Sequence, residues 1–194
     1  MKRCSWGSST PEYQRYHDEE WGRPVTDDRG IYERLTLEAF QSGLSWLTIL
    51  RKRENFREAF DGFDYERVAD YGEPEVERLL ADAGIVRNRA KVEAAIANAR
   101  AARELAAGDE SLAALAWSFL PERERAPRSG GDVPATTPES KALAQELKRL
   151  GFRFVGPTTA YALMQAVGIV NDHLAGCAVR DEVEAERPAR VKAR

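Results

Sequence analysis

The chain has 194 residues, of which 43% are hydrophobic and 31% are charged, and its formal net charge at pH 7 is −3. This length allows one sizeable hydrophobic core or at most two small lobes, and the composition is ordinary for a soluble globular protein. The weakly acidic charge argues against a protein that coats nucleic acid over its whole surface, but it is compatible with a local basic face.

Two further features bear on the compartment. No apolar run approaches the roughly 20 residues that a membrane-spanning helix needs, and no signal-peptide segment follows Met1. The chain has only two cysteines, which fits a reducing compartment where thiols meet metal ions more often than one another. We therefore expect a cytoplasmic protein with no membrane contact.

The first element in chain order is an aromatic-rich stretch, residues 4–21, which contains Cys4 and His17. His173 and Cys177 lie near the other end, and these four are the only cysteines and histidines in the sequence. Thiolate and imidazole ligands suit a tetrahedral Zn²⁺. Four protein ligands would fill its coordination sphere, so we predict one structural zinc that joins the two ends of the chain. The i, i+4 spacing of His173 and Cys177 predicts a helical turn that aims both side chains the same way.

Two other interpretations of these four residues are open. The cysteines could be small buried hydrophobic residues and the histidines ordinary buried polar groups. The second alternative is a disulfide between Cys4 and Cys177, but it leaves both histidines without a role.

The next element is a helix that Asp27 or Asp28 can cap and that runs to about Ser42. Its apolar face includes Ile31, and Glu38 lies on that same face seven residues later. A carboxylate on a buried helix face is costly unless something pairs with it. Glu38 is therefore the residue of this helix that most needs a functional explanation.

The rest of the chain also has helical periodicity, and we find no alternating strand pattern. Gly43 ends the first helix, and Ser45 can cap a second one that ends before Gly62. Further segments follow, predicted as helices at 74–83, about 88–107 and about 112–119, and as an exposed loop at 121–134. We expect one all-α domain over residues 1–178, followed by a charged, disordered tail over 179–194.

Residues 136–168 carry a second strong pattern. Thr136 and Glu139 fit a capping box that opens a helix, and Pro157 suits the first position of another. Between them Gly151 and Gly156 bound a short turn, so the order is helix, hairpin, helix over residues 140–168. In such a unit, backbone N–H groups at a helix N-terminus can hold a DNA phosphate.

The charge of this unit also suits DNA. Residues 141–157 contain one acidic residue, Glu146, and four basic ones, Lys141, Lys148, Arg149 and Arg153. A basic hairpin on an acidic protein is compatible with DNA binding that does not depend on base sequence. The alternative is an ordinary helical hairpin with a solvated surface.

Together these residues resemble the 3-methyladenine DNA glycosylase I family. The resemblance runs in order over about residues 1–178. It is carried by RCSW at 3–6, YHDEEWG at 16–22, LEAFQSGLSW at 37–46, RKREN at 51–55, GFRFVG at 151–156 and NDHLAGC at 171–177. It implies an all-α helix-hairpin-helix DNA glycosylase, a monomer with one structural zinc bound by Cys4, His17, His173 and Cys177.

The resemblance also implies roles for other residues. Glu38 would bond the edge of a flipped base as the catalytic carboxylate, in a pocket of five aromatic side chains, Trp6, Tyr13, Tyr16, Trp21 and Trp46. Leu44, after Gly43, falls where the family inserts a side chain into the gap in the DNA, although Ser42 is smaller than the polar residue often found there. The hairpin residues that would contact DNA are Gly151, Phe154, Gly156 and Thr158.

The implied reaction is hydrolysis of the N-glycosidic bond of 3-methyladenine in double-stranded, alkylated DNA, which leaves an abasic site. Helix-hairpin-helix glycosylases that also cut the strand use a lysine where this chain has Thr158, so we predict a monofunctional enzyme without Schiff-base chemistry. Those relatives also use an aspartate beyond the second helix. We predict that Asp172, near that place, orients His173 or caps a helix instead.

Three alternatives to this enzyme remain from the residues themselves. A zinc-stapled helix-hairpin-helix module could bind DNA or alkylated bases without catalysis, but such a module has no use for Glu38. The aromatic residues could form only a core around the zinc. A zinc hydrolase is disfavoured because four protein ligands leave no open coordination position.

Overall fold

The structure, a computed structural model, describes residues 1–108, 110–122 and 125–187, and within them it contains helices and no strand. The all-α prediction is therefore confirmed for this part of the chain. The α-helices are α1 (Pro11–Glu19), α2 (Asp28–Gln41), α3 (Trp46–Ala59), α4 (Tyr65–Val68), α5 (Glu73–Ala81), α6 (Arg89–Ala107), α7 (Leu112–Trp117), α8 (Pro138–Arg149), α9 (Pro157–Ala166) and α10 (Arg180–Glu186). Short 3₁₀ turns are η1 (Ser5–Ser8), η2 (Asp61–Phe63) and η3 (Gly130–Asp132). None of the described helices is both long and apolar enough to cross a bilayer.

The helix starts follow their capping residues. The side chains of Asp27, Ser45 and Asn88 each accept a hydrogen bond from a backbone N–H in the first turn of α2, α3 and α6; the caps at Asp27 and Ser45 are those that the sequence predicts. The capping box of α8 lies one residue later than predicted. Thr137 and Ser140 bond each other reciprocally, because Pro138, which has no N–H to donate, takes the first helical position.

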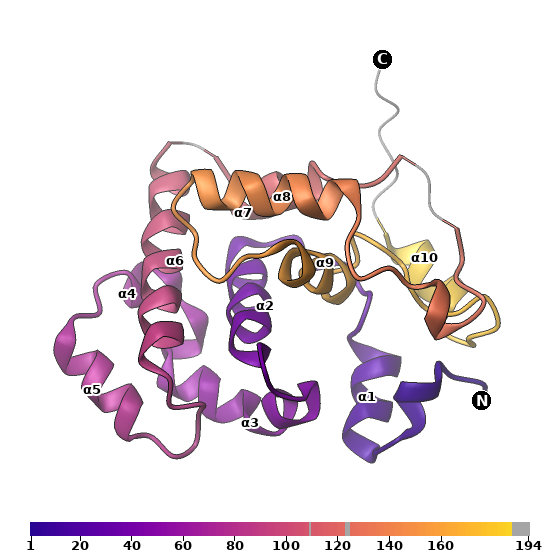
Figure 1. Ribbon diagram of the computed structural model, residues 1–194, viewed down its shortest axis with the longest axis horizontal. Coiled ribbons are helices and arrows are strands. Elements are labelled where there is room, and N and C mark those ends of the chain that lie inside the picture. Colours follow the sequence, from indigo (N-terminus) through magenta and orange to yellow (C-terminus); the bar gives the residue numbers. More distant parts are fainter. Residues whose placement is uncertain (109, 123–124, 188–194) are drawn as a thin grey trace.

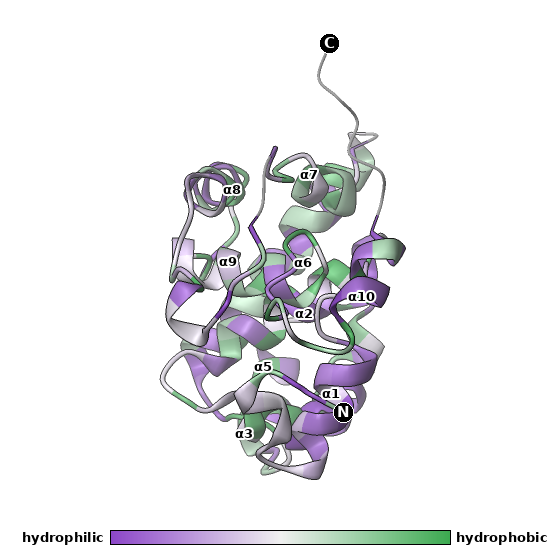
Figure 2. Cartoon of the chain, turned by 90° about the vertical axis from the view of Figure 1, so that its right-hand side faces the viewer, coloured by the Kyte–Doolittle hydropathy of each residue, from purple (hydrophilic) through white to green (hydrophobic). Residues whose placement is uncertain are grey.

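Helix α2 is the centre of the fold. It packs against α3, α6, α7 and α9, and α8 packs in turn on α9; Figure 1 shows α2 between α7 and α8 on one side and α3 on the other. Ile31, Leu35 and Phe40 of α2 are fully buried. In Figure 2, α1 is mainly hydrophilic and α7 mainly hydrophobic. The residues that α2 carries are thus held by neighbours on several sides.

The N-terminal segment and α10, the last helix that the structure describes, lie at the same end of the molecule. Figure 1 shows the N-terminal segment with α1 on the side where α10 also lies. Arg23, after α1, forms ion pairs with Glu182 and Glu186 of α10. This arrangement places the segments with the predicted metal ligands side by side.

The prediction that residues 179–194 are disordered is wrong for its first part. Residues 180–186 form α10, whose Val183 is fully buried, and the Arg187 side chain donates to the carbonyl groups of Gly168 and Ile169. One buried valine and several charged contacts hold this helix, so it has no apolar stripe for a sequence pattern to reveal. The rest of the predicted tail, 188–194, lies outside the described residues.

Candidate active site and metal cluster

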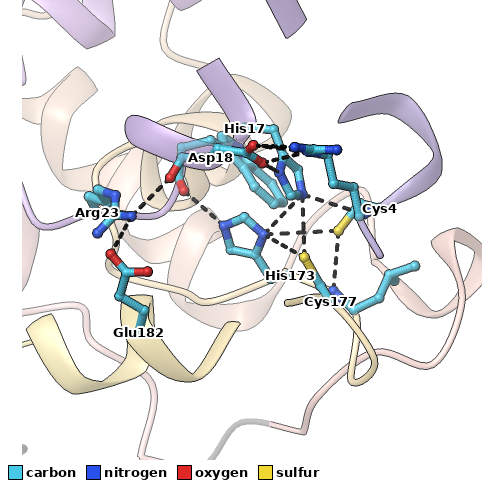
Figure 3. Close-up of polar contacts among 10 residues, drawn as sticks. Cys4, His17, Asp18, Arg23, His173, Cys177 and Glu182 are labelled. Carbon is cyan, nitrogen blue, oxygen red and sulfur yellow. Dashed lines mark hydrogen bonds and ion pairs between the residues drawn. The ribbon is translucent and has the colours of Figure 1, made fainter. Parts of the chain in front are cut away.

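The two cysteines and two histidines converge on one place in the structure, as predicted. Their ligand atoms all lie within 4.8 Å of one another, and all four residues are buried. Figure 3 shows the two sulfur atoms and the two rings turned toward a common centre. The His17 Nε2 atom is 3.2 Å from His173 Nδ1, while Cys177 Sγ lies 3.5 Å and 3.6 Å from these two nitrogens. Cys4 Sγ is 4.0 Å from His173 Nδ1. This donor set can hold a metal ion.

The outward nitrogen of each ring has its own partner. His17 Nδ1 lies 2.8 Å from a carboxylate oxygen of Asp18, and Arg3 in turn holds that carboxylate. His173 Nε2 lies 2.9 Å from the carbonyl oxygen of Trp21. Each acceptor places the ring proton on the outward nitrogen, which leaves the inward nitrogen with a lone pair for a metal. Burial also lowers the pKa of His173 to about 4, so its ring is neutral at pH 7.

One prediction about this cluster is wrong, and one alternative is excluded. His173 and Cys177 do not share a helical turn, because residues 171–179 form an irregular loop in which the Cys177 N–H donates to the Leu174 carbonyl at 2.7 Å. The loop brings the two side chains together through a tight turn at Gly176 instead. The disulfide alternative also fails, since both cysteines are free and buried.

Beside the cluster lies a cavity of about 410 Å³. All five predicted aromatic residues and Glu38 line it, together with residues that sequence reasoning missed. The missed residues come from the end of α2, the loop around η3, α9 and the 171–177 loop, and include Gln41, Gly130, Val133, Ala162, Gln165 and Leu174. Only the fold brings these segments together, since none carries a pocket signal of its own.

The aromatic wall of the pocket is shared with the metal cluster. Trp6 packs edge-to-face on Trp21 with ring centroids 5.0 Å apart, and on the ring of His17 at 5.1 Å. Trp21 packs on His173 at 4.7 Å. Such edge contacts are the favoured geometry of aromatic pairs. The two tryptophans therefore both line the pocket and pack against the cluster.

Glu38 is the charged group at the buried side of the pocket. The residue is only 8% exposed, and within the described residues its carboxyl group has no hydrogen-bond partner. Burial raises the pKa of Glu38 to about 8, and the positive charge of Arg34 opposes this shift in part. The indole N–H of Trp46 is also buried without a partner among the described residues. Unsatisfied polar groups in a cavity are unusual in folded proteins and are typical of a site that awaits a ligand.

Asp172 does not orient His173, contrary to our prediction. Its carboxylate lines the pocket and accepts hydrogen bonds from the Tyr161 hydroxyl at 2.6 Å and from Gln165 Nε2 at 2.8 Å. Both partners lie on α9, so they draw the side chain away from the cluster. The carbonyl of Trp21 and the carboxylate of Asp18 orient the histidines instead, and only the position of Asp18 next to His17 could have suggested this.

The predicted DNA-contacting residues lie on two loops. Gly43 (φ +82°) precedes Leu44, whose side chain is 41% exposed, in the turn between α2 and α3. Gly151 (φ +91°) and Phe154 (φ +55°) lie in the turn between α8 and α9, and the Phe154 side chain is 43% exposed. Gly156 is the N-cap of α9, and Thr158 lies in its first turn. Apart from Met1, Leu44 and Phe154 are the large hydrophobic residues that the described part of the chain exposes.

Comparison with known proteins gives consistent matches. The family model described as methyladenine glycosylase matches residues 6–181. DNA-3-methyladenine glycosylase 1 of Escherichia coli (strain K12) is 46% identical over 179 residues, which cover 91% of this chain and 96% of the relative. A crystal structure of 3-methyladenine DNA glycosylase I is 48% identical, with a TM-score of 0.88, and covers 91% of this chain and 98% of its own. A single-residue variant of that kind of glycosylase in complex with 3-methyladenine is 32% identical, with a TM-score of 0.87 and coverage of 93% and 98%.

The raised pKa of Glu38 makes a prediction about stability. Below pH 4.5, the ordinary pKa of the group, the carboxyl is protonated in both states and its ionisation has no effect on stability. Between 4.5 and about 8 only the unfolded chain ionises, so the free energy of unfolding falls as the pH rises through this window. We expect Glu38→Gln, which cannot ionise, to become more stable than the wild type, by roughly 4 kcal/mol at pH 8 and by less than about 1 kcal/mol at pH 5.

Urea unfolding of both proteins at the two pH values measures this difference. Glu58→Gln, at an exposed position of α3, is the control and should track the wild type. If the Glu38→Gln and wild-type stabilities differed by the same amount at pH 5 and pH 8, the carboxyl group would not be held in its neutral form by burial.

Proposed function

The chain belongs to the methyladenine glycosylase family, and we propose that its aromatic pocket receives 3-methyladenine flipped out of alkylated duplex DNA and releases it by hydrolysis of the N-glycosidic bond. The protein is thus a DNA repair glycosylase, a hydrolase that acts on N-glycosyl bonds. The observation that carries the proposal is Glu38: a buried carboxyl group that has no hydrogen-bond partner in the described part of the chain, at the wall of a cavity lined by five aromatic side chains.

The chemistry of the substrate explains why such a pocket suffices. An adenine alkylated at N3 carries positive charge in the nucleotide and leaves as a neutral base, so its glycosidic bond is already weak. The enzyme does not need to protonate the base; it has to take the nucleotide out of the stack and recognise it. Aromatic faces attract a cation by roughly 0.5 to 2 kcal/mol each, and more as water is excluded. The five aromatic residues supply these faces.

Glu38 adds selectivity for the charged base. A cation opposite the carboxyl group favours its ionised form and offsets the burial that raises its pKa. The ionised group can then accept a charge-assisted hydrogen bond from an N–H of the base. A neutral adenine offers no charge to offset the burial of the carboxylate. The pocket therefore favours the alkylated base over the undamaged one.

We assign DNA contact to the two loops. Leu44 is the side chain that would fill the gap left by the flipped nucleotide. The α8–α9 unit would act as a helix-hairpin-helix element that binds the DNA backbone. The N–H groups of Gly156 and Thr158 have no hydrogen-bond partner in the described residues, and they lie at a helix N-terminus, where a phosphate is favoured. Arg153 beside them is exposed and basic.

The metal ion that fits the cluster is zinc, in a structural role. Bond lengths of about 2.0 Å to nitrogen and 2.3 Å to sulfur in a tetrahedron separate two nitrogens by about 3.3 Å and a nitrogen and a sulfur by about 3.5 Å. The corresponding separations here are 3.2 Å, and 3.5, 3.6 and 4.0 Å. When bound, the ion would contribute folding free energy and no catalytic chemistry. Cys4, His17, His173 and Cys177 would hold it, and Trp6 and Trp21 would be fixed against them.

The catalytic proposal predicts the effect of replacing Glu38. Glu38→Gln keeps the shape of the side chain and removes its charge, so we expect single-turnover release of 3-methyladenine from methylated DNA to slow by an amount equivalent to roughly 1 to 3 kcal/mol. Glu58→Gln should leave the rate unchanged. Wild-type excision by Glu38→Ala would make the residue structural. A wild-type protein that binds methylated DNA and releases no base would support the non-catalytic DNA-binding module instead.

A second prediction concerns whether the enzyme cuts the DNA strand after it has released the base. With Thr158 where strand-cutting relatives have a lysine, no amine is expected to attack the sugar. Released base should therefore be accompanied by intact strands with abasic sites, and borohydride should trap no covalent protein–DNA adduct. Gel analysis of the DNA before and after alkali treatment distinguishes the two products. A trapped adduct would show that an amine from elsewhere in the chain takes part.

The zinc proposal predicts one equivalent of zinc per chain by elemental analysis. His173→Ala or Cys177→Ala should lose both the metal and the fold, because structural zinc supplies folding free energy directly. Asp18→Asn keeps all four ligands but weakens the acceptor on His17, so its zinc affinity should fall by roughly 10- to 100-fold while the protein still folds in excess zinc. If metal-free protein had the same melting temperature as the wild type with zinc, the proposed structural role of zinc would be wrong.

A further inference from the structure

Helix α6 carries two buried polar side chains that the proposed chemistry does not use. Lys91 is 8% exposed and Asn98 is fully buried, and neither lines the pocket. They are seven residues apart, which puts them on the same face of the helix two turns apart. Burying such groups is costly unless their hydrogen bonds are made. Their partners are therefore informative.

Lys91 holds the end of α2. Its Nζ atom donates to the carbonyl oxygens of Phe40 at 2.8 Å and Ser42 at 2.5 Å. Carbonyl groups at a helix C-terminus have no partner within the helix, and a positive charge there is favourable. The next two residues are Gly43 and the exposed Leu44. The buried lysine thus fixes the backbone from which Leu44 projects.

Asn98 holds the other loop in a similar way. Its Oδ1 atom accepts from the Arg153 N–H at 2.7 Å, and its Nδ2 atom donates to the Arg153 carbonyl at 3.1 Å. A neutral amide is the side chain that supplies one donor and one acceptor at this spacing. The next residue is Phe154, which has a positive φ and an exposed ring. Such a backbone conformation is unfavourable for a phenylalanine and persists only where its surroundings enforce it.

One rigid helix therefore grips both loops that expose a large hydrophobic side chain. We propose that Lys91 and Asn98 are positioning residues that set the separation of these loops, so that Leu44 and Phe154 engage distorted duplex DNA at the same time. This inference rests on the proposed function for the identity of the partner. The exposed Arg153 next to Phe154 suits a polyanion at the same place.

A fixed separation matters for a physical reason. Holding a flipped nucleotide requires the DNA to be bent and its stack to be opened, and contacts held in advance at two points do not have to be ordered during binding. Once either loop is released, the second contact loses this advantage. The effects of releasing one loop and both loops should then be nearly equal.

The test uses Lys91→Met, which keeps the apolar stem, Asn98→Leu, which is uncharged and close in shape, and the double variant. The matched control is Lys52→Met, because Lys52 also donates to two backbone carbonyls, those of Ala83 and Gly84, at 2.9 and 3.1 Å. Binding to a duplex with a stable abasic-site analogue is measured by fluorescence anisotropy. Binding of free 3-methyladenine is measured by tryptophan fluorescence, and melting temperatures are recorded.

We expect each single variant to weaken duplex binding roughly tenfold, with the double variant close to either single one. Affinity for free 3-methyladenine should change by less than about twofold, and Lys52→Met should bind duplex within about twofold of the wild type. The proposal is overturned if the double variant loses duplex affinity by the product of the two single-variant losses, or if neither single variant differs from Lys52→Met. It is also overturned if the affinities for the duplex and for free 3-methyladenine fall together. Because the abasic duplex contains no base to release, these outcomes are independent of the excision assay that tests the proposed function.

Discussion

The convergence of two cysteines and two histidines from opposite ends of the chain is the constraint on which the pocket depends. Trp6 and Trp21 pack on the rings of His17 and His173, so the same tryptophans are core residues toward the cluster and wall residues toward the cavity. Asp18 and the Trp21 carbonyl fix the outward nitrogens of the rings. The orientation of the aromatic wall is thereby set in part by His17, Asp18 and His173, which do not line the cavity.

Helices α2 and α3 also contribute to the wall of the pocket. On α2 this wall includes a carboxyl group, that of Glu38, whose burial is unfavourable. Glu38 lies on the central helix α2, and its carboxyl group has no hydrogen-bond partner among the described residues. In the proposed function, the same burial that raises its pKa would exclude water from a bound base and so strengthen the interaction with a cation. In the role proposed for Glu38, recognition and stability are in conflict at this position.

The two turns that expose Leu44 and Phe154 are held by hydrogen bonds from buried side chains of α6. Leu44 and Phe154 lie on short turns, and their side chains are exposed to solvent. The hydrogen bonds from Lys91 and Asn98 reach these turns from one helix on the inner side. The pocket and the two loops are thus parts of one frame, in which α2 carries Glu38 and ends at the turn that presents Leu44.

Local chemistry in the sequence determined much of this protein. Caps at Asp27, Ser45 and Asn88 and the proline at 157 begin helices where predicted, because each signal acts within one helical turn. The scarcity of cysteine and histidine was enough to group the four ligands. Tertiary structure alone decided that Asp172 turns to α9, that the 173–177 loop is not helical, that residues 180–186 are ordered, and that α6 reaches both loops. These contacts join residues far apart in the chain, such as Asn98 and Arg153, and a hydrogen bond between distant segments leaves no periodic or capping pattern in either of them.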